Sequence, residues 1–106
     1  MPKFLIKVSY SAEGSRGLIK EGGSGRRAAV QKVVENLGGK IEAFYFAYGE
    51  YDAYVITDFP DEGAGLALSL AVNSSGVVRI SSVPLITPEE VDAACKKSVL
   101  YRPPGA

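Results

Sequence analysis

The chain of 106 residues contains no histidine, no tryptophan and a single cysteine, Cys95. Without histidine it lacks the commonest general base at neutral pH and the commonest metal ligand. One cysteine cannot form an intrachain disulfide. With no histidine and only one cysteine, zinc, copper and haem sites would all need unusual ligands. We therefore expect no metal and no bound cofactor, and we expect Cys95 to be a packed or half-buried structural thiol in the final helix.

Long apolar runs and an excess of one charge are missing as well. No run approaches the roughly 18 apolar residues that suggest a membrane span. The N-terminus, "MPKFLIKVSY", has neither the apolar core nor the cleavage-like site of a signal peptide. Twelve basic residues balance twelve acidic ones, which leaves no basic excess to neutralise phosphate groups. We expect a cytoplasmic protein that binds neither nucleic acid nor membranes.

The length suits one compact domain over residues 1–106, with a core of its own. Its first segment, Lys3–Ser11, alternates apolar and polar residues and predicts a strand. Pro84 makes the last predicted strand an edge strand, because proline has no N–H to donate to a neighbour. Runs of β-branched and aromatic residues predict the other strands over residues 40–48, 51–59 and 76–86.

Only Gly49 and Glu50 separate the second and third predicted strands. A two-residue connection with glycine at its first position is typical of a hairpin turn that needs a positive φ. The two strands should therefore be antiparallel neighbours.

Helical spacing of apolar residues predicts one helix that Ser24 caps and that ends near Leu37. The glycine-rich stretch before it predicts a loose connection, with room for one helical turn around residues 16–21. A second helix is predicted from about Asp61 to Asn73, with Leu66 and Leu70 in its helical stripe.

The segment "TPEEVDAACKKSV" predicts a final helix, which Thr87 caps and in which Pro88 takes the first position. The ending "LYRPPGA" cannot be helical through its two prolines, so residues 100–106 are expected to form an extended tail. The order of elements predicts an α+β fold, a ferredoxin-like βαββαβ two-layer sandwich with an added C-terminal helix and tail.

The segment "FYFAYGEYDAYVI" resembles the characteristic hairpin of the GYD-domain family, with Gly49, Tyr51 and Asp52 at the positions for which that family is named. The stretches "KFLIKVSYSAEGSRGL", "EGGSGRRAAVQKVVENLGGK" and "YRPPGA" are similar to the family too. The resemblance implies a bacterial protein with a ferredoxin-like fold of the dimeric α/β-barrel type. It implies no catalytic residue, because the family has none assigned.

Two helices can cover only one face of the predicted sheet, and a second copy of the chain can cover the other. Alternation places Lys7, Asp52, Tyr54 and Arg79 on this open face. Asp52 is expected inside a central strand, where an unpaired charge is costly. It would either form an ion pair with Lys7 or Arg79, or contact a small anionic or aromatic ligand in a cavity between two sheets.

The segment "EGGSGRR" offers a second candidate site. A glycine-rich loop that leads into a helix N-terminus can bind an anion, here through Ser24, Gly25, Arg26 and Arg27. The spacing matches neither GxxxxGK nor GxGxxG, so a plain flexible loop with solvated arginines is the alternative.

The tail offers Tyr101 and Arg102 as a clasp on a neighbouring subunit, the alternative being a frayed terminus. The sequence thus predicts a small homo-oligomeric structural or ligand-binding module without intrinsic catalysis. The competing hypothesis is a cofactor-free oxygenase or isomerase that uses the cavity between the sheets.

Overall fold

The structure, a computed structural model, describes residues 2–106 and contains a four-stranded sheet and four helices. The elements follow one another as β1 (Lys3–Tyr10), α1 (Ala12–Glu21), α2 (Gly23–Asn36), β2 (Lys40–Phe46), β3 (Ala53–Asp58), α3 (Glu62–Ser74), β4 (Val78–Leu85) and α4 (Pro88–Cys95).

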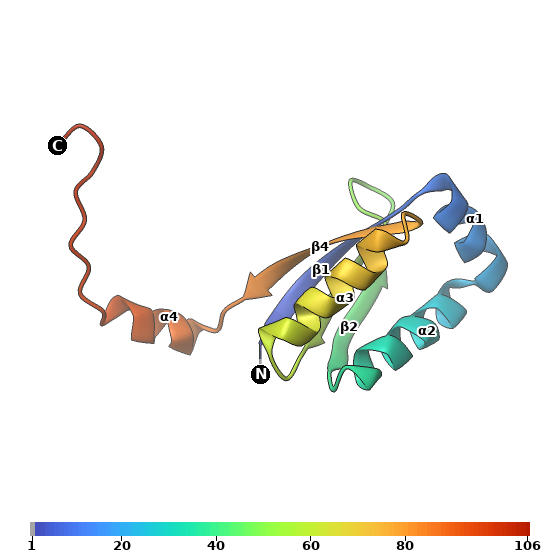
Figure 1. Cartoon of the computed structure of the whole chain (residues 1–106), viewed down its shortest axis with the longest axis horizontal. Helices are drawn as coiled ribbons and strands as arrows, with labels where there is room; N and C mark the ends of the chain where they lie inside the picture. Colours follow the sequence, from blue (N-terminus) through green and yellow to red (C-terminus); the bar gives the residue numbers. More distant parts are fainter. Residues whose placement is uncertain (1) are drawn as a thin grey trace.

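The sheet has the strand order β2-β3-β1-β4, and every neighbouring pair is antiparallel. Helices α2 and α3 run across the same face of the sheet, and no helix of residues 2–106 covers the other face (Figure 1). This α+β architecture is compatible with the predicted ferredoxin-like fold. It also confirms β4, which contains Pro84, as an edge strand.

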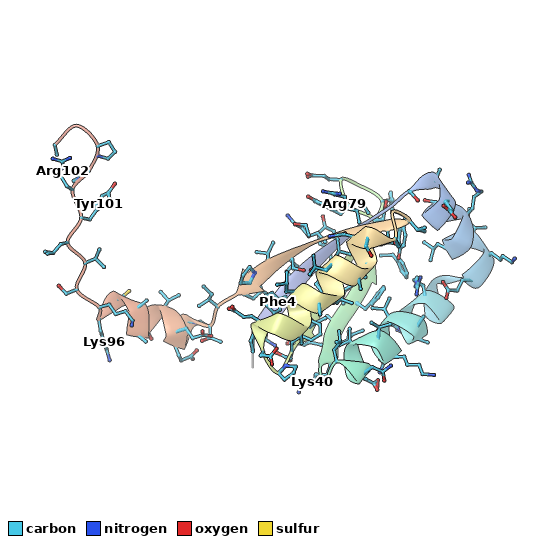
Figure 2. The ribbon with its side chains drawn as sticks, viewed as in Figure 1. Phe4, Lys40, Arg79, Lys96, Tyr101 and Arg102 are labelled. Atoms are coloured by element: carbon cyan, nitrogen blue, oxygen red, sulfur yellow. The ribbon has the colours of Figure 1, made fainter. Side chains whose placement is uncertain are left out.

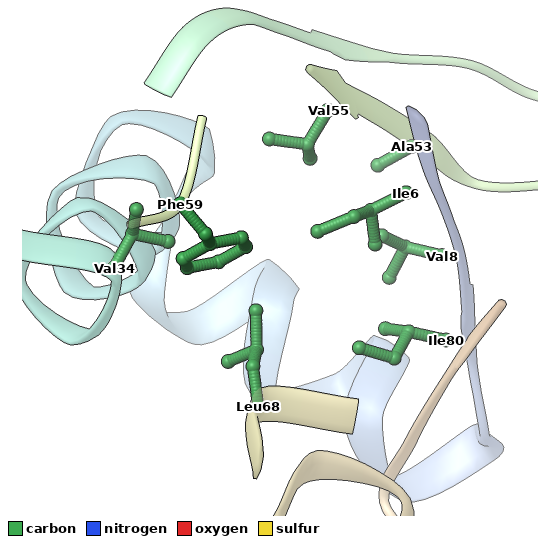
Figure 3. Close-up of a cluster of buried hydrophobic side chains, with 8 residues drawn as sticks. All are labelled: Ile6, Val8, Val34, Ala53, Val55, Phe59, Leu68 and Ile80. Carbon is green, nitrogen blue, oxygen red and sulfur yellow. The ribbon is translucent and has the colours of Figure 1, made fainter. Parts of the chain in front are cut away.

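The core lies between the sheet and the two helices. Inward residues of the central strands, such as Ile6 and Val55, point toward Phe59 and Leu68 (Figure 3). Because side chains alternate along a strand, the residues between them belong to the open face. Those open-face positions are Lys3, Leu5, Lys7 and Ser9 on β1, Tyr54 and Ile56 on β3, and Arg79, Ser81 and Val83 on β4.

The glycine-rich segment after β1 is helical, so the predicted loose connection is wrong. Ser11 caps α1 by accepting a hydrogen bond from the N–H of Gly14. A Cβ at Gly14 would lie 2.5 Å from the carbonyl oxygen of Val77, which explains a glycine inside this helix. Gly22, at φ 83°, then separates α1 from α2. Ser24 therefore lies in the first turn of α2 and is not its cap.

The connection between β2 and β3 is longer than the predicted two-residue turn. It spans residues 47–52, and Gly49 does not have a positive φ. The N–H of Ala47 donates to the carbonyl of Asp52 and closes this loop at 2.8 Å.

Helix α3 begins after Asp61, which caps it, but it presents a different face to the sheet than predicted. Leu66 and Leu70 are exposed, whereas Leu68 is buried. The side chain of Asn73 bonds both the N–H and the carbonyl of Ile80, at 2.7 and 3.1 Å. Because β4 is an edge strand, this clamp satisfies backbone groups that would otherwise be open to another strand.

Helix α4 has the predicted capping box at Thr87, with Pro88 in its first turn. All residues of α4 and of the tail are exposed, and together they extend away from the sheet beyond β4 (Figure 1). We call residues 86–106 the C-terminal arm. Cys95 is exposed on this arm, so the expectation of a packed or half-buried thiol is wrong.

Candidate ligand cavity and open sheet face

A cavity of about 280 Å³ lies between the sheet and the two helices that cover it. Helix α2 packs against β2 at one edge of the sheet, and α3 packs against β4 at the other. The space between the helices therefore opens over the central strands β1 and β3. The lining is mostly apolar, and its polar members are Tyr10, Arg26, Thr57 and Ser75. The apolar members are Ile6, Val8, Val30, Val33, Val34, Phe44, Val55, Leu68, Val72, Val77, Val78 and Ile80.

Two buried polar atoms in this lining have no partner. In the part of the chain that the structure describes, the only buried side-chain nitrogen or oxygen atoms without a hydrogen bond are Nε of Arg26 and Oγ1 of Thr57. Both residues line the cavity. Arg26 forms an ion pair with Glu21, but the 3.6 Å separation from Nε is too long for a hydrogen bond. Unpaired buried polar groups are uncommon in proteins, and both of these belong to residues of the cavity lining.

Tyr10 lies in the same lining, at the end of β1 near α2. Burial raises the pKa of its hydroxyl above the ordinary value, and the charges of Asp52 and Glu21 act in the same direction. The positive charge of Arg26 lowers this pKa and only partly offsets the rise. At neutral pH the Tyr10 hydroxyl is therefore neutral and can donate a hydrogen bond.

The open sheet face forms a second candidate site, and there the structure brings together two of the predicted residues. Lys7 and Tyr54 are direct partners in the β1–β3 register. The ammonium of Lys7 lies 4.9 Å from the centre of the Tyr51 ring, a cation–π contact. Tyr51 also meets the Tyr54 ring edge-on, with 6.0 Å between the centres. The result is a Lys7–Tyr51–Tyr54 cluster at one end of the face.

Asp52 forms hydrogen bonds with the backbone of β1 and of Ala47, the residue that follows β2. Its carboxylate accepts a hydrogen bond from the N–H of Tyr10 at 2.8 Å. Its own N–H donates to the carbonyl of Val8, and its carbonyl accepts from Ala47. Asp52 forms none of the ion pairs found within residues 2–106, so the expected pair with Lys7 or Arg79 does not form within one chain. The aspartate of the hairpin joins the ends of β1, β2 and β3.

At its opposite end the open face carries an ion cluster that the sequence did not predict. Lys3 contacts the carboxylates of Glu42 and Asp58, the latter at 3.0 Å. These two hydrogen bonds, with Glu42 contributing most, raise the pKa of Lys3. A register shift in β2 at Glu42, between Ile41 and Ala43, accompanies this contact.

The other predicted residues are dispersed. Arg79 pairs with Ser9 at the exposed edge of the open face. Ser24, Gly25 and Arg27 lie in the first turns of α2, and of this predicted group Arg26 alone lines the cavity. Tyr101 and Arg102 lie in the tail, far from the labelled Arg79 (Figure 2).

Neither a metal centre nor a membrane span emerges from residues 2–106. They contain no group of three or more acidic or cysteine side chains that could hold a metal ion together. None of their helices is long and apolar enough to cross a bilayer.

The chain matches a known protein family. The sequence profile described as "GYD domain" matches residues 4–95, which is most of the chain. No curated protein and no solved structure shows significant similarity to it.

Proposed function

We propose that this chain, which belongs to the GYD domain family, is a homo-oligomeric small-molecule-binding module without intrinsic catalysis. The aspartate of its hairpin, Asp52, joins the ends of three strands. Two copies would pack open sheet face against open sheet face, as in a dimeric α/β barrel. Each copy would hold its own ligand between the sheet and the helices.

The observation that carries this proposal is the cavity with its two unpaired polar atoms. Well-packed cores leave few voids larger than a water molecule, and a void of this size forgoes packing energy. Ligand pockets typically measure roughly 300–1,000 Å³ and combine apolar walls with a few polar groups. At about 280 Å³, with Tyr10, Arg26 and Thr57 in its lining, this cavity fits a small ligand.

The lining argues for binding over catalysis. It includes no carboxylate, no thiol and no imidazole. The lining itself therefore supplies no general base that could activate its hydroxyl groups as nucleophiles. A positioned cation, a tyrosine and a threonine suit the recognition of a ligand better than proton transfer at neutral pH.

Two surfaces support self-association. The open face combines apolar side chains such as Leu5, Ile56 and Val83 with both signs of charge, as a self-complementary two-fold interface requires. The arm exposes Val91, Val99, Leu100 and Tyr101. The radius of gyration is 17.0 Å, whereas a compact domain of this length has about 13 Å. An arm that leaves its own body in this way is suited to contact a second copy.

Light scattering coupled to size exclusion tests the assembly, and competition with a fluorescent apolar probe tests the ligand site. We expect a dimer or larger assembly that binds the probe with about one site per chain. Deletion of residues 97–106 should weaken the assembly and leave probe binding intact. A monomer that binds no probe would contradict the proposal, and turnover of a bound compound would favour the oxygenase or isomerase alternative.

A further inference from the structure

We propose that the cavity takes an apolar molecule with one anionic end, of the medium-chain aliphatic carboxylate class, whose carboxylate bonds to Arg26. This inference rests on the proposed ligand-binding function and specifies the chemistry of the same site.

The anionic end follows from Arg26. Arg26 lines the cavity, and its Nε is buried and donates to no acceptor among the described residues. Arginine cannot lose its proton in a protein, so this donor needs an acceptor, and a carboxylate is the strongest one. Arg26 lies in the first turn of α2, where the helix dipole also favours negative charge.

The charges around Arg26 permit such a ligand. Glu21 is the nearest carboxylate, and at 3.6 Å it pairs with Arg26 without taking the Nε hydrogen bond. The Asp52 carboxylate is held by the N–H of Tyr10. The neutral Tyr10 hydroxyl adds a second donor within the same lining.

The apolar character follows from the walls. The cavity is lined along β1 by Ile6, Val8 and Tyr10, a path of about 13 Å at the rise of a strand. A volume of about 280 Å³ suits a small ligand. Valine side chains of both α2 and α3 line the cavity, among them Val30, Val33 and Val72.

Thr57 lies toward the opposite end of the cavity lining. It pairs with Phe4 at the start of β1, whereas Arg26 lies near the end of β1 with Tyr10. Its hydroxyl is fully buried and unpaired.

Calorimetric titration of the full chain with octanoate and with 1-octanol separates the contribution of the anionic group to the affinity from that of the apolar chain. We expect octanoate to bind at least tenfold more tightly than octanol, the effect of a charge-assisted hydrogen bond. Arg26→Gln should remove this difference, whereas the neighbouring Arg27→Gln should leave it within about twofold. Glu21→Gln should tighten octanoate binding, because it removes the competing carboxylate.

Circular dichroism and thermal melting establish that each variant is folded, and Arg26→Lys, which keeps the charge, serves as the second variant. Equal affinities for octanoate and octanol, unchanged by Arg26→Gln, would overturn the inference and leave the ligand-binding function standing. Failure of both compounds, and of the fluorescent probe, would overturn the function itself.

Discussion

Thr57 on β3 and Arg26 on α2 each place an unpaired, buried polar atom in the lining of one cavity. The two residues come from different layers of the fold and lie toward opposite ends of the central strand β1. Arg26 has an unpaired donor and Thr57 an unpaired hydroxyl, and both residues line a cavity that can hold another molecule. The presence of both residues in one lining is the strongest physical sign of function in this chain.

Replacement of Thr57 by valine should stabilise the ligand-free protein. The substitution removes an unpaired buried hydroxyl and keeps the shape, so we expect the free energy of unfolding to rise by about 1 kcal/mol. Urea unfolding measures the change. Thr57→Ser, which keeps the hydroxyl and loses a methyl group, should instead lower stability by about 1 kcal/mol. A loss of stability in Thr57→Val would mean that the hydroxyl already has a partner.

Replacement of Asp52 by alanine should destabilise the fold. The N–H of Tyr10 would lose its acceptor at a half-buried position, which costs about 1–3 kcal/mol. Asp52→Asn keeps an acceptor oxygen and should recover part of this loss. Glu50→Ala, an exposed position in the same loop, is the matched control and should leave the urea midpoint unchanged.

A charge at the centre of the open sheet face should prevent assembly. Ile56 lies between Leu5 and Ala43 on that face, and Ile56→Glu would bury an unpaired carboxylate in a dimer. We expect the dissociation constant to rise at least tenfold, measured by analytical ultracentrifugation. Leu66→Glu places the same charge on the exposed side of α3 and should have no effect. If Leu66→Glu weakened the assembly and Ile56→Glu did not, the interface would lie on the helices and not on the open sheet face.

Stability should fall at alkaline pH. The pKa values of both Tyr10 and Lys3 are raised in the folded state. Each group therefore stabilises the fold below its unfolded pKa of about 10, and that contribution is lost as the pH rises through the folded pKa.

Urea unfolding at intervals from about pH 9 to about pH 11.5 measures this loss. Tyr10→Phe should make the decline shallower, whereas Tyr48→Phe, at a fully exposed tyrosine, should not. Identical slopes for the wild type and both variants would show that Tyr10 does not contribute.

The sheet was predictable because its signals are local. Alternation in residues 3–11 identified β1, and Pro84 identified the edge strand. Thr87 and Pro88 likewise defined the start of α4. The hairpin length was not predictable, because Asp52 fixes the loop through bonds to β1 and to Ala47 at the start of the loop.

Two helices show where local signals were insufficient. In α1 the glycines suggested a loop, although Ser11 with the N–H of Gly14 forms a regular cap and the close approach of Val77 requires that glycine. In α3 apolar residues occur on every side. The helical period therefore could not distinguish the buried Leu68 from the exposed Leu66.

The cavity could not be predicted from the sequence, because it arises from the spacing of α2 and α3 on the sheet. Arg26 was a predicted site residue, but as part of a loop. Thr57 was missed, and its signal is a polar residue at an inward position after Ala53 and Val55 in the alternation of β3. Such a residue in an otherwise apolar row indicates either a hydrogen bond within the core or a ligand.

Methyl NMR during a titration with octanoate tests most directly whether the ligand site lies between the sheet and the helices. We expect the largest chemical-shift changes at Val30, Val33, Leu68 and Val72, which line the cavity. Changes concentrated at Leu5, Ile56 and Val83, on the open face of the sheet, would contradict it.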